Sequence, residues 1–334
     1  MSERLLSIDS LWLRLPRVAQ RAVLSGVELE VARGEMVGLV GESGSGKSLT
    51  ARAVLGLLPA EAQTTGRVLV GGLDVLTCDR KALRDLRAST ASMVFQDPRA
   101  GLNPVRRIGD FLTEAVRASG RLSGAAATAR ALELLGAVGL PDPRLHLTQY
   151  PHQLSGGMLQ RVMIAGALMS EPRLLLCDEP TTALDVTTQA EIVAVLRRLQ
   201  RERGMGMLFI THDLDLAAAT CDRVYVMYAG HMVEEAPAAE LFSAPRHPYT
   251  AGLLASRPRL GDEDGRLGSI PGSLPRLLED SGGCPFAPRC SLADEVCRVL
   301  PAMVRHGSRS SRCAHPGVVD LAAAAHAESL RGVS

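Results

Sequence analysis

The sequence predicts an α/β fold built on a mainly parallel sheet with helices on its faces. Short apolar segments alternate with stretches of helical periodicity, the pattern of parallel strands joined by crossover helices. A glycine-rich loop, residues 41–48, stands between an apolar segment and a helical one. After about residue 243 the chain is rich in proline and glycine and loses this periodicity. We therefore expect a large α/β domain followed by a smaller unit of different character.

The N-terminal segments predict strands before any helix. Residues 5–40 alternate in polarity and then run apolar, so we expect two or three strands that form an antiparallel β edge, the last at Met36–Val40. The glycine loop follows, and residues 48–58 have the spacing of a helix. A further strand pair fits residues 66–70 and 92–95.

The middle of the chain predicts a helical insert. Residues 107–170 are rich in Ala and Leu at helical spacing, with few β-branched runs. Beyond them we expect strands and helices in alternation: Leu174–Asp178 as a strand, Val186–Arg203 as a helix, and residues 207–211 and Arg223–Tyr228 as strands. The Ala-rich residues 318–330 are expected to form a short helix or to be disordered.

The charge balance excludes one class of partner. Lys and Arg number 37 and Asp and Glu 36 among 334 residues, so no general basic field favours nucleic acid. No uninterrupted apolar run reaches the roughly 18 residues that a membrane-spanning helix needs, and the first residues lack the apolar core of a signal peptide. We expect a cytoplasmic protein that reaches a membrane only by docking on another chain.

The loop Gly41-Glu-Ser-Gly-Ser-Gly-Lys-Ser48 has the residues that bind a nucleotide phosphate. Its glycines let backbone N–H groups turn toward phosphate oxygens. Lys47 is expected to reach the β- and γ-phosphates, and the Ser48 hydroxyl to ligate Mg²⁺. A chance glycine-rich turn is the alternative, but the flanking strand and helix argue against it. The candidate ATP-binding residues are Gly41, Ser43, Gly44, Ser45, Gly46, Lys47, Ser48 and Leu49.

Two carboxylates follow the apolar strand at Leu174–Asp178. Asp178 at a strand end is placed to hold Mg²⁺, directly or through water. Glu179 is placed to accept a proton from an attacking water. The alternative is a pair of surface acids at a strand end.

Four further short motifs stand in a fixed order along the chain: Phe95-Gln-Asp-Pro98, Leu154-Ser-Gly-Gly157, Thr182-Ala-Leu-Asp185 and Ile210-Thr-His-Asp213. With the glycine loop and the strand that ends at Asp178, they resemble the motif series of ATP-binding-cassette (ABC) ATPases. The resemblance implies a P-loop fold, and an ATPase that uses Mg²⁺ and works as a dimer of two facing cassettes.

The resemblance also implies a role for each motif. Glu179 would be the general base, and His212 would contact the γ-phosphate by a hydrogen bond. Gln96 would sense the γ-phosphate or join Ser48 and Asp178 at Mg²⁺, and the loop after it would meet a membrane partner. Asp185 would reach across the dimer.

The run Ser155-Gly-Gly157 resembles the ABC signature, which caps ATP held by the facing domain. Gly156 and Gly157 permit close backbone approach to phosphate. Ser155 can cap a helix that starts here, whose N-terminus would point at the γ-phosphate. An ordinary Ser-Gly-Gly linker is the alternative, and the helical pattern over residues 160–169 argues against it.

The adenine contact departs from the family pattern. ABC ATPases usually stack adenine on an aromatic side chain near the N-terminal strands, but the expected place holds Leu15. Trp12 is the only nearby aromatic, and strand alternation puts it on the opposite face from Leu15. Either Trp12 serves through a register shift, or apolar packing replaces stacking; we favour the second.

Several segments resemble one branch of this family, the dipeptide, oligopeptide and nickel importer ATPases. They are Asp97-Pro-Arg-Ala-Gly-Leu-Asn-Pro104, Pro245-Arg-His-Pro-Tyr-Thr250 and Gly283-Cys-Pro-Phe-Ala-Pro-Arg-Cys290. The match covers about residues 5–316 and is closest to the first of the two paired ATPases. It implies an ATPase that energises import of peptides, or of a related solute such as a nickel chelate, at the cytoplasmic face of the cell membrane.

The resemblance further implies the partners and the domains. The partners would be a second, non-identical ABC ATPase, two membrane permease subunits and an extracytoplasmic solute-binding protein. The nucleotide-binding domain would span residues 1–250, with a helical subdomain at about 97–170. Residues 251–334 would form a Cys-rich C-terminal extension.

Four cysteines gather in that extension: Cys284, Cys290, Cys297 and Cys313. All-thiolate ligation suits zinc or an iron–sulfur cluster, and free thiols are a third reading that the spacing leaves open. The resemblance implies a [4Fe–4S] cluster with a structural role. We expect Cys290→Ser to unfold the extension while leaving ATP binding largely intact.

Two other functions remain to be weighed. A soluble ABC ATPase of translation or DNA repair is one, although the near-neutral charge argues against it. A degenerate cassette that binds ATP without hydrolysis is the other, and the intact Glu179 and His212 argue against that.

Overall fold

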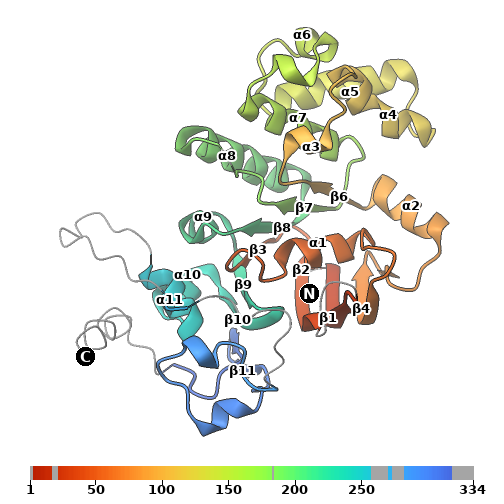
Figure 1. The fold of residues 1–334 in the computed structure, drawn as a ribbon. Helices are drawn as coiled ribbons and strands as arrows, with labels where there is room; N and C mark the ends of the chain where they lie inside the picture. Colours follow the sequence, from red (N-terminus) through yellow and green to blue (C-terminus); the bar gives the residue numbers. More distant parts are fainter. Residues whose placement is uncertain (1–2, 17–21, 183, 257–269, 273–281, 318–334) are drawn as a thin grey trace.

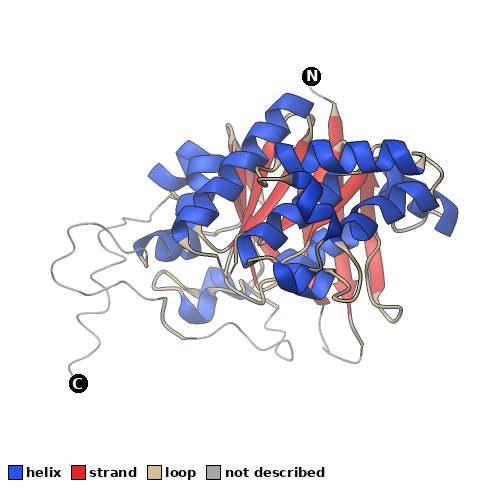
Figure 2. Ribbon diagram, turned by 90° about the horizontal axis from the view of Figure 1, so that it is seen from above, coloured by secondary structure: helices blue, strands red, loops and turns tan. Residues whose placement is uncertain are grey.

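The computed structural model describes residues 3–16, 22–182, 184–256, 270–272 and 282–317. The strands of this part form a four-stranded sheet, in the order β2-β1-β4-β5, and an eight-stranded sheet, in the order β11-β12-β10-β9-β3-β8-β7-β6. Helices pack around the strands, which pass through the middle of the molecule (Figure 2). The α/β architecture expected from the sequence, strands of a large sheet with helices packed against them, is therefore present.

The element bounds are as follows. The strands are β1 (Arg4–Arg14), β2 (Ala22–Ala32), β3 (Met36–Val40), β4 (Gln63–Val70), β5 (Leu73–Asp74), β6 (Ala91–Val94), β7 (Leu174–Asp178), β8 (Gly206–Thr211), β9 (Arg223–Tyr228), β10 (His231–Pro237), β11 (Val304–His306) and β12 (Arg309–Ser311). The α-helices are α1 (Lys47–Val54), α2 (Arg80–Ser89), α3 (Pro98–Gly101), α4 (Ile108–Ala118), α5 (Gly124–Ala137), α6 (Pro143–Thr148), α7 (Gly156–Leu168), α8 (Val186–Arg203), α9 (Leu214–Thr220), α10 (Ala238–Ser243) and α11 (Pro248–Ala255). Three short 3₁₀ helices cover Pro151–Gln153, Ala287–Arg289 and Glu295–Arg298.

The parallel part of the large sheet positions the candidate site. Strands β6, β7, β8, β3 and β9 lie side by side in parallel. All five residues of β3 and of β7 are buried, as expected for strands covered on both faces. Because parallel strands end at the same edge of a sheet, the segments that follow β3, β6, β7 and β8 meet there. Those segments hold the glycine loop, Gln96, Glu179 and His212.

The antiparallel β edge predicted at the N-terminus is also present. Strand β1 pairs with β2 on one side and with β4 on the other, both antiparallel. Leu11 and Leu13 are buried while Trp12 between them is exposed, so one face of this sheet closes over a core and the other meets solvent.

The helical insert forms a group of its own. Helices α4, α5, α6 and α7 contact one another, and Figure 1 shows them at the end of the molecule opposite the C-terminal extension. Their apolar faces, including Leu112, Leu135 and Leu159, join the buried cluster that covers one side of the large sheet. The start of α7 is therefore held by a group of helices that packs as a unit against the large sheet.

Some segments differ from the sequence prediction. Helix α1 ends at Val54, short of residue 58, because the chain turns at Gly56 with φ of 61°. Residues 66–70 and 92–95 do not pair with each other, since β4 belongs to the small sheet and β6 to the large one. Helix α2 was not predicted; most of its residues are polar, and only Leu86 of them is buried.

The C-terminal extension is joined to the large sheet. Strand β12 pairs with β10, and β11 pairs with β12. Helix α11 runs across the predicted domain boundary at residue 250. Residues 318–330, predicted to be helical or disordered, lie outside the described residues.

Candidate active site

The glycine loop has backbone geometry that only glycine accepts. Gly41 has φ of 148°, and a Cβ there would lie 2.1 Å from the backbone oxygen of Met227. Gly46 has φ of 112°, and a Cβ there would lie 2.7 Å from Cδ2 of Leu24. L side chains are strained at such φ angles, and these positions leave no space for one. The sequence pattern of the loop therefore follows from its shape.

Lys47 lies beneath this loop. Its side chain is buried, and Nζ donates to the carbonyl oxygens of Gly41 at 2.8 Å and of Glu42 at 2.9 Å. Burial lowers the pKa of Lys47, while the charges of Glu179, Asp178 and Glu42 raise it. The ammonium group of Lys47 is therefore placed to bind an anion that enters the glycine loop.

Ser48 and Asp178 form the second part of the site. Ser48 Oγ donates to Asp178 Oδ1 at 2.8 Å, linking the start of α1 to the end of β7. Burial raises the pKa of Asp178, and the hydrogen bond from Ser48 acts against that rise. Two oxygen ligands at this distance fit the preference of Mg²⁺ for hydroxyl and carboxylate groups.

Glu179 is the meeting point of three donors. Its Oε2 lies 3.1 Å from Gln96 Nε2, 2.9 Å from Thr182 Oγ1 and 3.2 Å from His212 Nδ1. Glu179 also has φ of 46°, which is costly for a residue with a side chain. The fold therefore holds this carboxylate in one orientation, with its partners drawn from the ends of three different strands.

The signature residues occupy the start of helix α7. Ser155 is its N-cap, and Ser155 Oγ accepts from the backbone N–H of Met158 at 3.3 Å. A Cβ on Gly157 would lie 2.7 Å from Cγ2 of Thr188. Asp185 caps helix α8, accepting from the backbone N–H and the hydroxyl of Thr188 at 3.0 and 2.8 Å. Signature and D-loop thus form a second group on the same chain.

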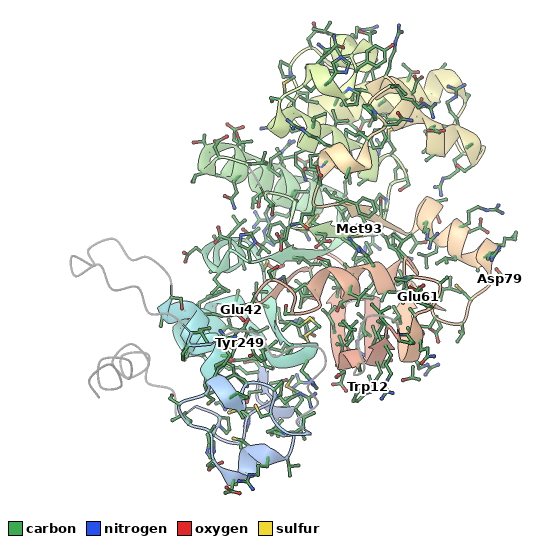
Figure 3. All side chains as sticks on the ribbon, in the orientation of Figure 1. Trp12, Glu42, Glu61, Asp79, Met93 and Tyr249 are labelled. Atoms are coloured by element: carbon green, nitrogen blue, oxygen red, sulfur yellow. The ribbon has the colours of Figure 1, made fainter. Side chains whose placement is uncertain are left out.

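Trp12 and Leu15 are the two candidate adenine contacts at the N-terminal strands. Trp12 is 44% exposed, and its indole lies over Gly26 of the neighbouring strand. Figure 3 shows it at the end of the small sheet. Leu15 is partly buried and packs against the core of that sheet. The choice between these two residues remains a prediction.

Sequence reasoning missed several residues of this region. Thr182 was noted only as part of the D-loop motif, yet its hydroxyl bonds to Glu179. Glu42 of the glycine loop bonds through its backbone N–H to Tyr249 and through its carboxylate to Arg289. The only signal for Arg289 in the sequence was its place just before a cysteine.

The four cysteines of the extension lie near one another. Burial raises the pKa of Cys290 to about 11, and the charges that Cys284, Cys313 and Cys297 would carry raise it as well. Backbone N–H groups donate to sulfur, as His315 does to Cys313 Sγ at 3.3 Å. Four such thiols cannot all ionise together without a cation to balance them.

A second set of ligand atoms shares one of these cysteines. Asp294, Cys297 and His315 each offer a ligand atom, and these atoms lie within 4.8 Å of one another. His315 Nε2 and Asp294 Oδ2 are 3.1 Å apart. Among the described residues, this mixed set is the group of three or more His, Cys, Asp and Glu ligand atoms that lie this close together.

Comparison with known proteins identifies the family. Residues 24–182 match the family described as ABC transporter, and residues 233–297 match the one described as oligopeptide/dipeptide transporter, C-terminal region. The oligopeptide transport ATP-binding protein of Salmonella typhimurium is 47% identical over 81% of this chain and 81% of its own. The dipeptide transport ATP-binding protein of Haemophilus influenzae is 44% identical over 87% of this chain and 88% of its own. The chain belongs to the ABC transporter ATPases.

Solved structures agree with this assignment. CbiO1 of Clostridium perfringens, part of an ABC transporter complex, is 29% identical with a TM-score of 0.63, over 72% of this chain and 91% of that one. A dimeric ATP-binding cassette bound to ADP and phosphate is 28% identical with a TM-score of 0.62, over 70% of this chain and 98% of that one. Because the chain belongs to this family, its nucleotide is ATP, which is bound together with Mg²⁺.

ABC ATP-binding subunits of importers work at the cytoplasmic face of a membrane, and membership in the family gives this chain that location. In the described part of the chain, none of the helices is both long enough and apolar enough to span a membrane.

Proposed function

We propose that this ABC ATPase hydrolyses ATP to drive import of dipeptides or oligopeptides through a membrane transporter. The observation that carries hydrolysis is the Glu179 carboxylate held by three donors. The observation that favours peptides over other solutes is the match of residues 233–297 to the C-terminal region of peptide transporters. The relatives' names support the same choice.

ATP binding falls to the glycine loop. Backbone N–H groups of residues 41–48 would surround the phosphates, and Lys47 would turn from its carbonyl partners toward the β- and γ-phosphates. Ser48 and Asp178, whose oxygen atoms are 2.8 Å apart, would hold Mg²⁺ together with Gln96, whose amide donates to the neighbouring Glu179. The metal would supply charge neutralisation at the phosphates.

Hydrolysis falls to Glu179. A carboxylate that receives hydrogen bonds from Gln96, Thr182 and His212 is oriented to take the proton of an attacking water. His212 is 62% exposed, so its ring is free to turn toward the γ-phosphate when ATP binds. One carboxylate and its partners therefore couple proton transfer to nucleotide sensing.

The second half of each ATP site would come from a facing cassette. Ser155, Gly156 and Gly157 begin a helix, so their backbone N–H groups would meet the γ-phosphate held by the partner. Asp185 would lie at the dimer seam beside them. The proposed partner is a second, non-identical ABC ATPase, with two permease subunits docked near the loop after Gln96 and a solute-binding protein outside the cell.

The four cysteines are proposed to hold a [4Fe–4S] cluster that staples the extension, residues 251–334, onto the nucleotide-binding domain. The interaction of Cys290 with the three other cysteines and the N–H···S hydrogen bond at Cys313 are consistent with a cationic centre there. Zinc is the second candidate, because Asp294, Cys297 and His315 form a mixed donor set.

Metal analysis of the full chain, purified without oxygen, separates these candidates. About four iron and four sulfide per chain, with visible absorption lost in Cys290→Ser but kept in Cys78→Ser, is the expected result. Stoichiometric zinc without sulfide would replace the cluster by zinc, and neither metal would leave free thiols.

The transporter assignment is tested by purifying the tagged chain from gently solubilised native membranes. The expected companions, identified by mass spectrometry, are two permeases, a second cassette ATPase and a solute-binding protein. Recovery only from the soluble fraction, with ribosomal or DNA-repair proteins, would overturn the assignment in favour of a soluble ABC ATPase.

A further inference from the structure

Every polar group of Glu42, the second residue of the glycine loop, has a partner. Its backbone N–H donates to Tyr249 Oη at 2.8 Å, and its carbonyl oxygen accepts from Lys47 Nζ at 2.9 Å and from the N–H of Ser45 at 3.2 Å. Figure 3 shows Glu42 and Tyr249 side by side. The first turn of the loop is therefore fixed through this residue.

The carboxylate of Glu42 is held by the C-terminal extension. Arg289 Nη1 donates to Glu42 Oε2 at 2.8 Å, and Nη2 donates to Oε1 at 3.0 Å. This paired geometry is the strong form of an arginine–carboxylate contact. Arg289 has only 6% of its side chain exposed, and it also donates to Pro271 O, Ile270 O and Tyr228 Oη. A buried arginine with this many partners has one orientation.

The segment that carries Arg289 is anchored beside the loop by aromatic packing. Phe286 is buried, with its ring centroid 5.2 Å from that of Tyr228 and 5.4 Å from that of Tyr249. Tyr228 ends strand β9, and Tyr249 belongs to helix α11. Phe286 and Arg289 both lie between Cys284 and Cys290, so the conformation of this cysteine loop sets where they point.

The charge of Glu42 is unfavourable where a polyphosphate must bind. Glu42 is one of the three carboxylates whose charge is felt at Lys47, the residue beneath the loop. Its carbonyl oxygen accepts from Lys47 Nζ, so its negative charge lies near the proposed phosphate site and would repel the phosphates of ATP. A guanidinium paired with both carboxylate oxygens cancels most of that charge and keeps the side chain turned away.

We propose that Arg289 is a positioning residue for ATP binding. By pairing with Glu42, it fixes the conformation of the glycine loop and neutralises the charge of the Glu42 carboxylate. The cysteine loop that carries Arg289, from Cys284 to Cys290, therefore sets the affinity for ATP. The inference rests on the proposed role of the loop in binding ATP. It changes the expectation that Cys290→Ser leaves ATP binding intact, because a disordered cysteine loop withdraws Arg289 from Glu42.

The test compares three variants of the full chain: Arg289→Gln, Glu42→Gln and the double variant. MgATP binding is measured by isothermal titration calorimetry, and folding by circular dichroism. Arg289→Gln leaves a bare carboxylate at the loop, so we expect the dissociation constant to rise about tenfold. Glu42→Gln breaks the same ion pair but removes the repelling charge, so its loss is smaller. The double variant is expected to recover to within about threefold of the parent chain.

Arg298→Gln is the matched control, because this arginine lies in the same extension but is exposed, and its ion-pair partner among the described residues is the equally exposed Glu295. Its ATP affinity should equal that of the parent chain. Equal losses in Arg289→Gln and Glu42→Gln with no recovery in the double variant would overturn the proposal and leave a purely structural ion pair. A folded Arg289→Gln chain with parental affinity would also overturn it. Absence of ATP binding in the parent chain itself would instead refute the proposed function.

Discussion

Glu179→Gln tests the general base with almost no change of shape. In the folded chain Glu179 Oε2 accepts from Gln96, Thr182 and His212 at 3.1, 2.9 and 3.2 Å. An amide oxygen in the same place can still accept these hydrogen bonds, but it has no charge and does not take a proton from water. The substitution therefore removes the base while keeping the arrangement of its neighbours.

The size of the effect follows from the two roles of the carboxylate. A positioned general base contributes about 10²- to 10⁴-fold to rate, which is about 3 to 5 kcal/mol in the barrier. Hydrogen bonds to a charged acceptor are worth about 1.5–3 kcal/mol and neutral ones about 0.5–1.5 kcal/mol, so some order around position 179 is lost as well. ATP affinity should stay the same or rise, because Glu179 is the carboxylate whose negative charge acts most strongly on Lys47. Its removal leaves the Lys47 charge more available to the phosphates.

The assay is phosphate release by the assembled transporter, with MgATP binding measured on the same preparation. Glu61→Gln, an exposed glutamate away from the site, is the control and should turn over at the parental rate. Glu179→Gln should bind ATP and lose hydrolysis at this site. Undiminished turnover, or ATP binding lost together with hydrolysis, would refute the reasoning.

Three further substitutions have defined outcomes. Thr182→Val removes the hydroxyl that donates to Glu179, so kcat should fall about three- to tenfold at unchanged KM, and a KM change alone would contradict this. Gly46→Ala places a Cβ 2.7 Å from Leu24 at φ of 112° and should cost about 1–3 kcal/mol in thermal unfolding. Burial lowers the pKa of His247 to about 3 in the folded chain. Between about pH 6.5 and pH 3 the unfolded chain therefore binds one proton more than the folded chain. The free energy of unfolding should fall by about 1.4 kcal/mol for each pH unit in this range as the pH is lowered. His247→Asn keeps an acceptor at the start of helix α11, and urea unfolding at pH 7 and 5 should show a shallower fall; an unchanged slope would rule His247 out as its source.

Much of the cassette could be predicted from the sequence because its signals are local. Met36–Val40, Val186–Arg203 and Arg223–Tyr228 are strand, helix and strand with the predicted bounds. An apolar strand, a glycine loop and a helix in succession leave few alternative structures. Gln96, Glu179 and His212 meet because each follows a parallel strand, and such strands end at one edge of the sheet.

Other features depend on contacts that no local pattern reports. Arg289 and Glu42 are 247 positions apart, and a single arginine near cysteines gives no hint of a partner in the glycine loop. Thr182 reaches Glu179 only because of the turn made at Glu179 by its positive φ.

The central claim is that this chain couples ATP hydrolysis to peptide import, and reconstitution tests it most directly. The transporter would be placed in liposomes with MgATP enclosed, and the solute-binding protein with a labelled oligopeptide added outside. We predict peptide-stimulated ATP hydrolysis together with peptide accumulation, both abolished by Glu179→Gln. Hydrolysis that ignores peptide, or accumulation that continues in Glu179→Gln, would contradict the claim.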